Sequence, residues 1–64
     1  MNNDLKKIRF LNGELTQQEL ADKLNVSRQT IHSIEKGKFN PSVKLALKIA
    51  DLFNAKVEDI FYLE

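Results

Sequence analysis

The chain contains no cysteine, only two glycines and a single proline among its 64 residues. Without cysteine it can form no disulfide, perform no thiolate chemistry and build no cysteine-ligated zinc site. The cross-links that stabilise many very small domains are therefore excluded. The scarcity of glycine and proline, together with 42% hydrophobic residues, indicates a folded chain rather than a disordered one. We therefore expect an apolar core, helped by dimerisation, to hold the domain together.

Long apolar runs are also missing. No segment approaches the roughly 18 consecutive apolar residues of a membrane span, and the polar opening, residues 1–4, is unlike a signal peptide. We therefore expect a cytoplasmic protein without membrane contact. The chain is about half the length of a usual domain, so residues 1–64 are expected to form one domain.

Charge is distributed unevenly along the chain. Residues 1–50 carry nine Lys and Arg against five Asp and Glu, whereas residues 51–64 carry one Lys against four acidic residues. This asymmetry is typical of a protein that presents one surface to a polyanion and another to a different partner, although solvated charge alone gives the same pattern.

Helical spacing of apolar residues predominates, and no stretch alternates apolar and polar residues as a strand would. The sequence therefore predicts an all-α fold of five helices. The first helix is expected to follow the polar residues 2–4, to bury the stripe Leu5, Ile8 and Leu11, and to stop at residues 12–13.

The second and third helices are predicted to form a helix-turn-helix. Thr16 and Glu19 have the spacing of a capping box, which starts a helix over residues 17–24. Two short helices that cross steeply need a small residue where they touch. The turn between them needs a residue that accepts a left-handed backbone, followed by an apolar side chain buried beneath the turn. Ala21, Asn25 and Val26 supply these in that order.

Ser27 is predicted to cap the third helix, with Ile31 and Ile34 anchoring its buried side. The opposite side then projects outward and suits the major groove of DNA, which admits one helix. Arg28 can form two hydrogen bonds to guanine, and Gln29 can form two to adenine. The residues expected to contact bases are Arg28, Gln29, Thr30, His32 and Ser33.

Phosphate contacts are expected around this helix. Gln17 lies at a helix N-terminus, where free N–H groups favour an anion, and two lysines and an asparagine follow the third helix. The residues expected to contact phosphates are Gln17, Ser27, Lys36, Lys38, Asn40 and Arg9.

The C-terminal third is richer in apolar residues than a small core needs. We expect a fourth helix over residues 43–53, capped by Ser42 and ended by Asn54, and a short fifth helix around residues 57–61. Part of this apolar surface should form a two-fold dimer interface, unless it simply completes the core. The residues expected at that interface are Leu52, Phe61, Tyr62 and Leu63.

At these positions the chain resembles the Cro/phage-repressor (XRE-type) helix-turn-helix family of transcription regulators. The resemblance spans nearly the whole chain and rests on Thr-Gln-x-Glu-Leu-Ala at 16–21, Ser-Arg-Gln-Thr-Ile at 27–31, Ile-Glu-x-Gly-Lys at 34–38 and Asn-Pro-Ser at 40–42. It implies a five-helix, lambda-repressor-like domain whose third helix, from about Ser27 to Lys36, enters the major groove. It also implies a repressor that binds double-stranded DNA as a homodimer, at a pseudo-palindromic operator.

Three positions depart from the family pattern. Asn25 and Asn54 stand where the family usually has glycine, and because asparagine tolerates a left-handed backbone we expect the fold to survive. Lys56 replaces the usual cap of the fifth helix, which weakens its start. Many relatives add an effector-binding domain, whereas this sequence ends at Glu64, so no small-molecule effector is expected.

Other readings stay open from the sequence. The outward residues of the third helix also fit solvated positions, and His32 is as compatible with a phosphate contact, or with none, as with a base contact. Glu35 is expected to bond within the chain, to Gln18, a lysine or Arg9, because an unpaired carboxylate would repel DNA. Arg9 has phosphate as its alternative partner. An alternative function of a different class is a protein-interaction module, antitoxin-like or accessory, that binds its partner through the apolar C-terminal end.

Catalysis is not expected. His32 lies on an outward helix face, and Glu58 and Asp59 are adjacent and diverge, so the chain offers no catalytic triad. One histidine and no cysteine leave only scattered carboxylates as metal ligands. We therefore expect neither enzymatic activity nor a metal ion or cofactor.

Overall fold

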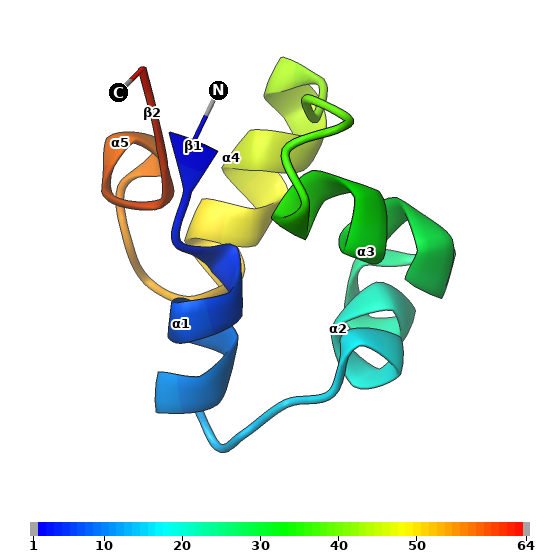
Figure 1. Cartoon of the computed structure of the whole chain (residues 1–64). Helices are drawn as coiled ribbons and strands as arrows, with labels where there is room; N and C mark the ends of the chain where they lie inside the picture. Colours follow the sequence, from blue (N-terminus) through cyan, green and yellow to red (C-terminus); the bar gives the residue numbers. More distant parts are fainter. Residues whose placement is uncertain (1, 64) are drawn as a thin grey trace.

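The computed structural model describes residues 2–63, and within them it has five helices joined by short turns (Figure 1). The helices are α1 Leu5–Leu11, α2 Gln17–Leu24, α3 Arg28–Glu35, α4 Val43–Leu52 and α5 Val57–Ile60. Two-residue strands, β1 Asn2–Asn3 and β2 Phe61–Tyr62, join the chain ends as an antiparallel pair. The predicted all-α class is confirmed. The strand pair was missed because two residues are too few to show an alternating pattern.

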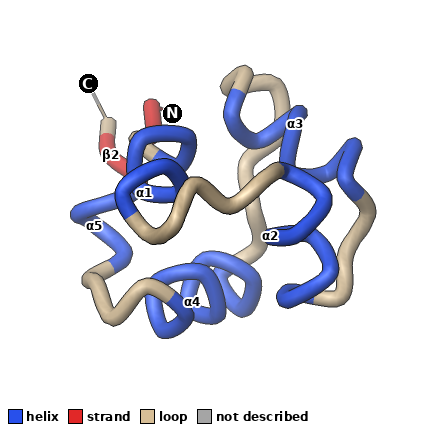
Figure 2. The backbone as a smooth tube through the Cα atoms, turned by 90° about the horizontal axis from the view of Figure 1, so that it is seen from below, coloured by secondary structure: helices blue, strands red, loops and turns tan. Residues whose placement is uncertain are grey.

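The helix pair α2–α3 lies on one side of the molecule, and α5 with the β1–β2 pair lies on the other (Figure 1, Figure 2). The side chains at the centre come from all five helices. Those that are essentially inaccessible to solvent are Leu5, Leu20, Ile31, Ile34, Ile49 and Ile60.

Hydroxyl side chains begin three of the helices, as the sequence predicts. Thr16, Ser27 and Ser42 each accept a hydrogen bond from the backbone N–H three residues later, at 3.0, 3.1 and 3.1 Å. Each cap satisfies one N–H group that has no partner within the helix. The start of α3, which decides where the exposed edge of that helix begins, is therefore set by Ser27.

The C-terminal segment differs from the prediction in two ways. The fourth helix ends at Leu52 rather than residue 53, with Asn54 in the expected left-handed conformation at φ 53°. Lys56 offers no side-chain cap to α5, but the Asp59 carboxylate accepts the Lys56 N–H at 3.2 Å. The side chain of the third helical residue thus bonds the backbone N–H that precedes the helix, and α5 can start without a hydroxyl cap.

Two apolar residues are not where the sequence placed them. Leu11 was predicted to complete the buried stripe of α1, but it is 73% exposed because α1 ends there, beyond the core. Phe61 was predicted in the fifth helix with a partly exposed side chain. It lies in β2 instead and is 6% exposed, because alternation along the strand turns Phe61 inward and Tyr62 outward.

The Tyr62 hydroxyl ties β2 to the start of α1 by donating a hydrogen bond to Asp4 Oδ1 at 3.0 Å. This bond, with burial and the Asp4 charge, raises the pKa of Tyr62 above its ordinary value of 10.0. A raised pKa in the folded state means that the bond stabilises the fold below about pH 10 and that this contribution is lost as the pH rises through the raised pKa.

We therefore expect an absorbance titration of Tyr62, the only tyrosine in a chain without tryptophan, to have its midpoint above that of the unfolded chain. Asp4→Ala should move the midpoint back down. Identical midpoints in the folded protein and in the variant would show that the hydroxyl bond does not persist in solution.

Candidate nucleic-acid interface

The turn between α2 and α3 is held by the residues that the sequence singles out. Asn25 has a left-handed backbone, φ 59° and ψ 44°, and its N–H donates to the carbonyl oxygens of Ala21 and Asp22. The Val26 N–H also donates to the Ala21 carbonyl, at 3.0 Å, and Val26 packs against the core. Because Ala21 is fully buried and has a minimal side chain, α3 can approach α2 closely at this point.

The exposed edge of α3 begins immediately after its cap. Ile31 and Ile34 are buried, which fixes the rotation of the helix about its axis. Arg28 and Gln29 in the first turn are exposed, whereas Thr30, His32 and Ser33 are half-buried. The five residues predicted to contact bases thus differ in accessibility, and the two with the best hydrogen-bonding groups for bases are the most accessible.

Gln17 connects the start of α2 with the exposed edge of α3. Its Oε1 accepts a hydrogen bond from Arg28 Nη1 at 3.1 Å, and its Nε2 donates to Glu35 Oε1 at 3.1 Å. Reversing the amide would set its oxygen against the carboxylate and its NH₂ group against the guanidinium. The Glu35 carboxylate therefore selects the amide orientation that accepts a bond from Arg28.

Arg9 does not lie on the exposed surface. Its Nε and Nη2 donate to the two carboxylate oxygens of Glu35 at 2.8 and 3.1 Å, and its Nη1 donates to the Leu15 carbonyl at 2.6 Å. The side chains of this ion pair are 9% and 7% exposed. Arg9 is therefore the partner of Glu35 among the three that the sequence left open, and this pair occupies the guanidinium that was also expected to contact phosphate.

His32 faces α2 rather than open solvent. Its Nδ1 lies 3.4 Å from Gln17 Nε2, which already donates to Glu35. Where this contact is made, Gln17 Nε2 donates and Nδ1 accepts, which leaves Nε2 as the ring nitrogen available to a base or a phosphate.

The residues after α3 extend the exposed surface beyond the C-terminal end of that helix. Gly37 takes a positive φ of 75°, and the N–H groups of Lys38 and Phe39 both donate to the Ser33 carbonyl, at 3.0 and 3.3 Å. These bonds fold the segment back over the end of α3. Lys36, Lys38 and Asn40 are exposed there, as a phosphate ligand must be. Ser27, by contrast, already uses its hydroxyl on the backbone N–H and the side chain of Thr30.

A polar hollow lies between α1, α2 and α3. It has a volume of about 270 Å³, and its lining includes Lys6, Gln17, His32 and Lys36. Lys6 was not predicted as a site residue. Its position could have been predicted from the sequence, since Lys6 precedes Arg9 by three residues and residues at that spacing share one face of a helix.

The residues predicted for a dimer interface do not form one surface. Leu52 lines a shallow hollow with Leu24 and Asn25 at the end of α2, whereas Phe61 lines a groove on the other side of α4. The two most exposed residues of α4 along that groove are Val43, 78% exposed, and Leu47, 56% exposed. Leu52 lies about half a turn around the helix from Val43, which explains the separation.

Residues 2–63 contain no group of three histidine or acidic side chains placed to hold a metal ion. The same part of the chain contains no helix with both the length and the apolar character of a bilayer span.

Comparison with known proteins agrees with this geometry. A sequence model of the family described as helix-turn-helix matches residues 5–60, which includes all five helices. A protein of Methanocaldococcus jannaschii named as an uncharacterized HTH-type transcriptional regulator is 61% identical over 64 residues, which are all of this chain and 96% of that protein. The Bacillus subtilis protein YgzD, with the same description, is 45% identical over the same shares of the two chains.

An Archaeoglobus fulgidus protein, again named as an HTH-type transcriptional regulator, is 64% identical over 47 residues, which are 73% of this chain and 66% of that protein. The family match and the two relatives aligned over all 64 residues cover the turn, the caps and the exposed edge of α3. This chain therefore belongs to the XRE (Cro/C1-type) helix-turn-helix family, a non-enzymatic family of DNA-binding transcriptional regulators.

Proposed function

We propose that this protein is a sequence-specific repressor that binds double-stranded DNA as a homodimer, with α3 in the major groove. The observation that carries the proposal is the accessible pair Arg28 and Gln29, placed in the first turn of α3 by the Ser27 cap and by the buried side of the helix. The N-terminal residues of a recognition helix are those that reach base edges in this type of domain.

In the proposed complex Arg28 reads guanine and Gln29 reads adenine, each through two hydrogen bonds. The half-buried residues Thr30, His32 and Ser33 supply contacts deeper along the helix. Phosphates are bound by the backbone N–H of Gln17 at the start of α2 and by the exposed side chains at and after the end of α3, namely Lys36, Lys38 and Asn40.

Selection of bound fragments from a random pool of DNA duplexes tests this proposal directly. We expect enrichment of a pseudo-palindrome whose half-sites are centred about one helical turn, roughly 34 to 36 Å, apart. Placed across a reporter promoter, the selected site should lower expression when the protein is present. A pool that remains random would contradict sequence-specific binding, and an asymmetric single site would contradict the two-fold arrangement.

We further propose that the dimer forms through the apolar groove on the side of the molecule with α5. Val43, Leu47, Val57 and Phe61 line it, and Leu63, 84% exposed, follows Phe61 by two residues. A second copy of this chain is the occupant we propose, because the groove is apolar and lies away from the α2–α3 side that faces phosphates. Tyr62 remains a proposed member of this surface, whereas Leu52 does not.

Leu47→Lys is expected to convert the dimer to a monomer, because it places a charge in the groove while leaving the core untouched. Sedimentation equilibrium measures the change, and DNA with two half-sites should bind less tightly while a single half-site binds as before. Leu52→Lys, which changes the same residue type on the same helix but on its other side, is the matched control. Equal behaviour of the two variants would exclude the groove as the interface.

A further inference from the structure

The polar hollow between α1, α2 and α3 receives positive charge from α1 in addition to that of the helix-turn-helix. Its lining contains three cationic side chains, Lys6, Arg9 and Lys36, and a single carboxylate, that of Glu35. Glu35 is satisfied by its two hydrogen bonds from Arg9 and one from Gln17. The charge that remains for an external anion is that of the two lysines.

Both lysines are free to bind a ligand. Lys6 and Lys36 are exposed, and among residues 2–63 the ion pair that the structure shows is that of Arg9 with Glu35, which involves neither lysine. The long aliphatic stem of a lysine lets its ammonium group reach over a distance, and the ammonium binds phosphate as a point charge.

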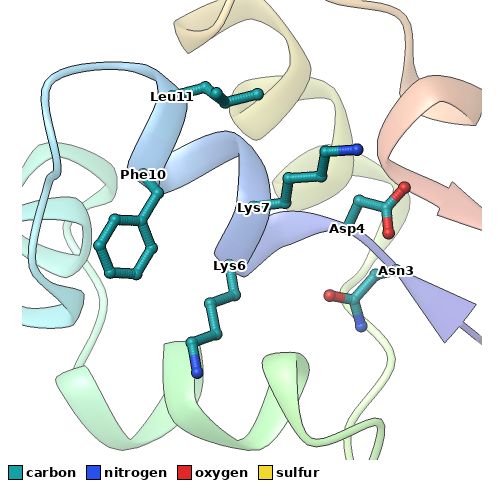
Figure 3. Close-up of a pocket in the computed structure, with 6 residues that line it drawn as sticks. All are labelled: Asn3, Asp4, Lys6, Lys7, Phe10 and Leu11. Carbon is teal, nitrogen blue, oxygen red and sulfur yellow. The ribbon is translucent and has the colours of Figure 1, made fainter.

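The neighbouring lysine of α1 is placed differently. Figure 3 shows Lys6 extending from α1 toward the ribbon of α3, while Lys7 extends toward the side of α5 and lies near Asp4. Lys6 lines the hollow together with Gln17 and His32, and Lys7 does not. Both lysines also line a hollow along α1 with Phe10 and Leu11, but of the two only Lys6 reaches the hollow between α1, α2 and α3.

We propose that Lys6 is a phosphate ligand, and that the hollow formed by Lys6, Gln17, His32 and Lys36 receives one phosphate group of the DNA backbone. This inference rests on the proposed function and extends the DNA-contacting surface from the helix-turn-helix onto α1. Lys6 and Lys36 approach the phosphate from two different helices, while the neutralised Glu35 at the floor does not repel it.

The test is the salt dependence of binding, with fluorescently labelled random-sequence duplex as the probe. Each phosphate contact contributes a slope of about 0.9 to the fall of log affinity with log salt concentration. We expect Lys6→Ala to reduce the slope by about this amount, so that between about 50 and about 200 mM salt it loses roughly 3.5-fold less affinity than the wild type. The selected operator should weaken equally, since a phosphate ligand carries no sequence information.

Lys7→Ala is the matched control, because it removes the same charge from the same helix. Its slope should equal that of the wild type, and circular dichroism should show both variants folded. Equal slopes for Lys6→Ala and the wild type, or equal losses for Lys6→Ala and Lys7→Ala, would overturn the inference while leaving the proposed function intact. Absence of salt-sensitive binding by the wild type to any duplex would overturn both.

Discussion

Arg9→Ala is expected to cost about 3 to 5 kcal/mol of the free energy of unfolding, the largest effect of any substitution considered for this chain. The substitution deletes the guanidinium that donates two hydrogen bonds to Glu35 and one to the Leu15 carbonyl. The Glu35 side chain, only 7% exposed, then loses the cation that donates to both of its carboxylate oxygens. A domain of this size has a total free energy of unfolding of about 3 to 10 kcal/mol. The variant should therefore be largely unfolded at the melting temperature of the wild type.

Denaturant unfolding followed by circular dichroism measures the loss. The double variant Arg9→Met, Glu35→Leu is the informative control, because replacing both partners of a buried ion pair by apolar residues is often neutral, whereas removing one partner is not. We expect it to recover most of the stability. A loss below about 1 kcal/mol for Arg9→Ala would mean that the pair behaves as an exposed surface ion pair, and the structural role assigned to Arg9 would be wrong.

The ion pair also marks the limit of what the sequence predicts. The caps at Thr16, Ser27 and Ser42 and the turn at Asn25 depend on residues within a few positions of each other, and all four are found as predicted. The pairing of Arg9 with Glu35 joins residues 26 positions apart. Local patterns carry no information on which of several possible partners is chosen, so the sequence left Gln18, a lysine and Arg9 as alternatives.

The N-terminal segment shows the same limit. The Asn3 side chain donates to the Ile34 carbonyl at 2.8 Å, and the Asp4 N–H donates to the Ile60 carbonyl at 2.9 Å. These bonds attach residues that were expected only to precede α1 to the ends of α3 and α5. They also explain why Phe61 pairs in a strand rather than extending α5, because the polar chain start supplies an antiparallel partner.

The side of α3 that faces outward could be predicted, but the contacts along that side could not. Helical periodicity alone separates the buried Ile31 and Ile34 from Arg28 and Gln29. It does not show that Gln17, on another helix, accepts a hydrogen bond from Arg28, nor that His32 turns toward Gln17. Both contacts follow from the packing of α3 against α2.

Arg28→Ala is expected to cost about 1 to 3 kcal/mol of binding free energy on the preferred operator and to relax the preference at one base-pair position in each half-site. The exposed guanidinium is the group of this chain best suited to two hydrogen bonds with guanine. Competition binding with operators altered at each position measures the effect. Lys38→Ala is the control, because a phosphate ligand should weaken all sequences alike and lower the salt slope by about one. Equal losses on operator and random DNA for Arg28→Ala would refute its reading role.

Gln17 should decide how much of that preference Arg28 can express. Its Oε1 holds the guanidinium at 3.1 Å, and Glu35 keeps the amide in the orientation that permits this bond. Gln17→Ala frees Arg28 to sample other rotamers, so ordering its guanidinium on one base costs more side-chain entropy. A double-mutant cycle on the operator should therefore give a coupling energy of about 0.5 to 3 kcal/mol between Gln17 and Arg28. Strict additivity would mean that Gln17 acts on phosphate alone, and that Arg28 finds its base without the contact from α2.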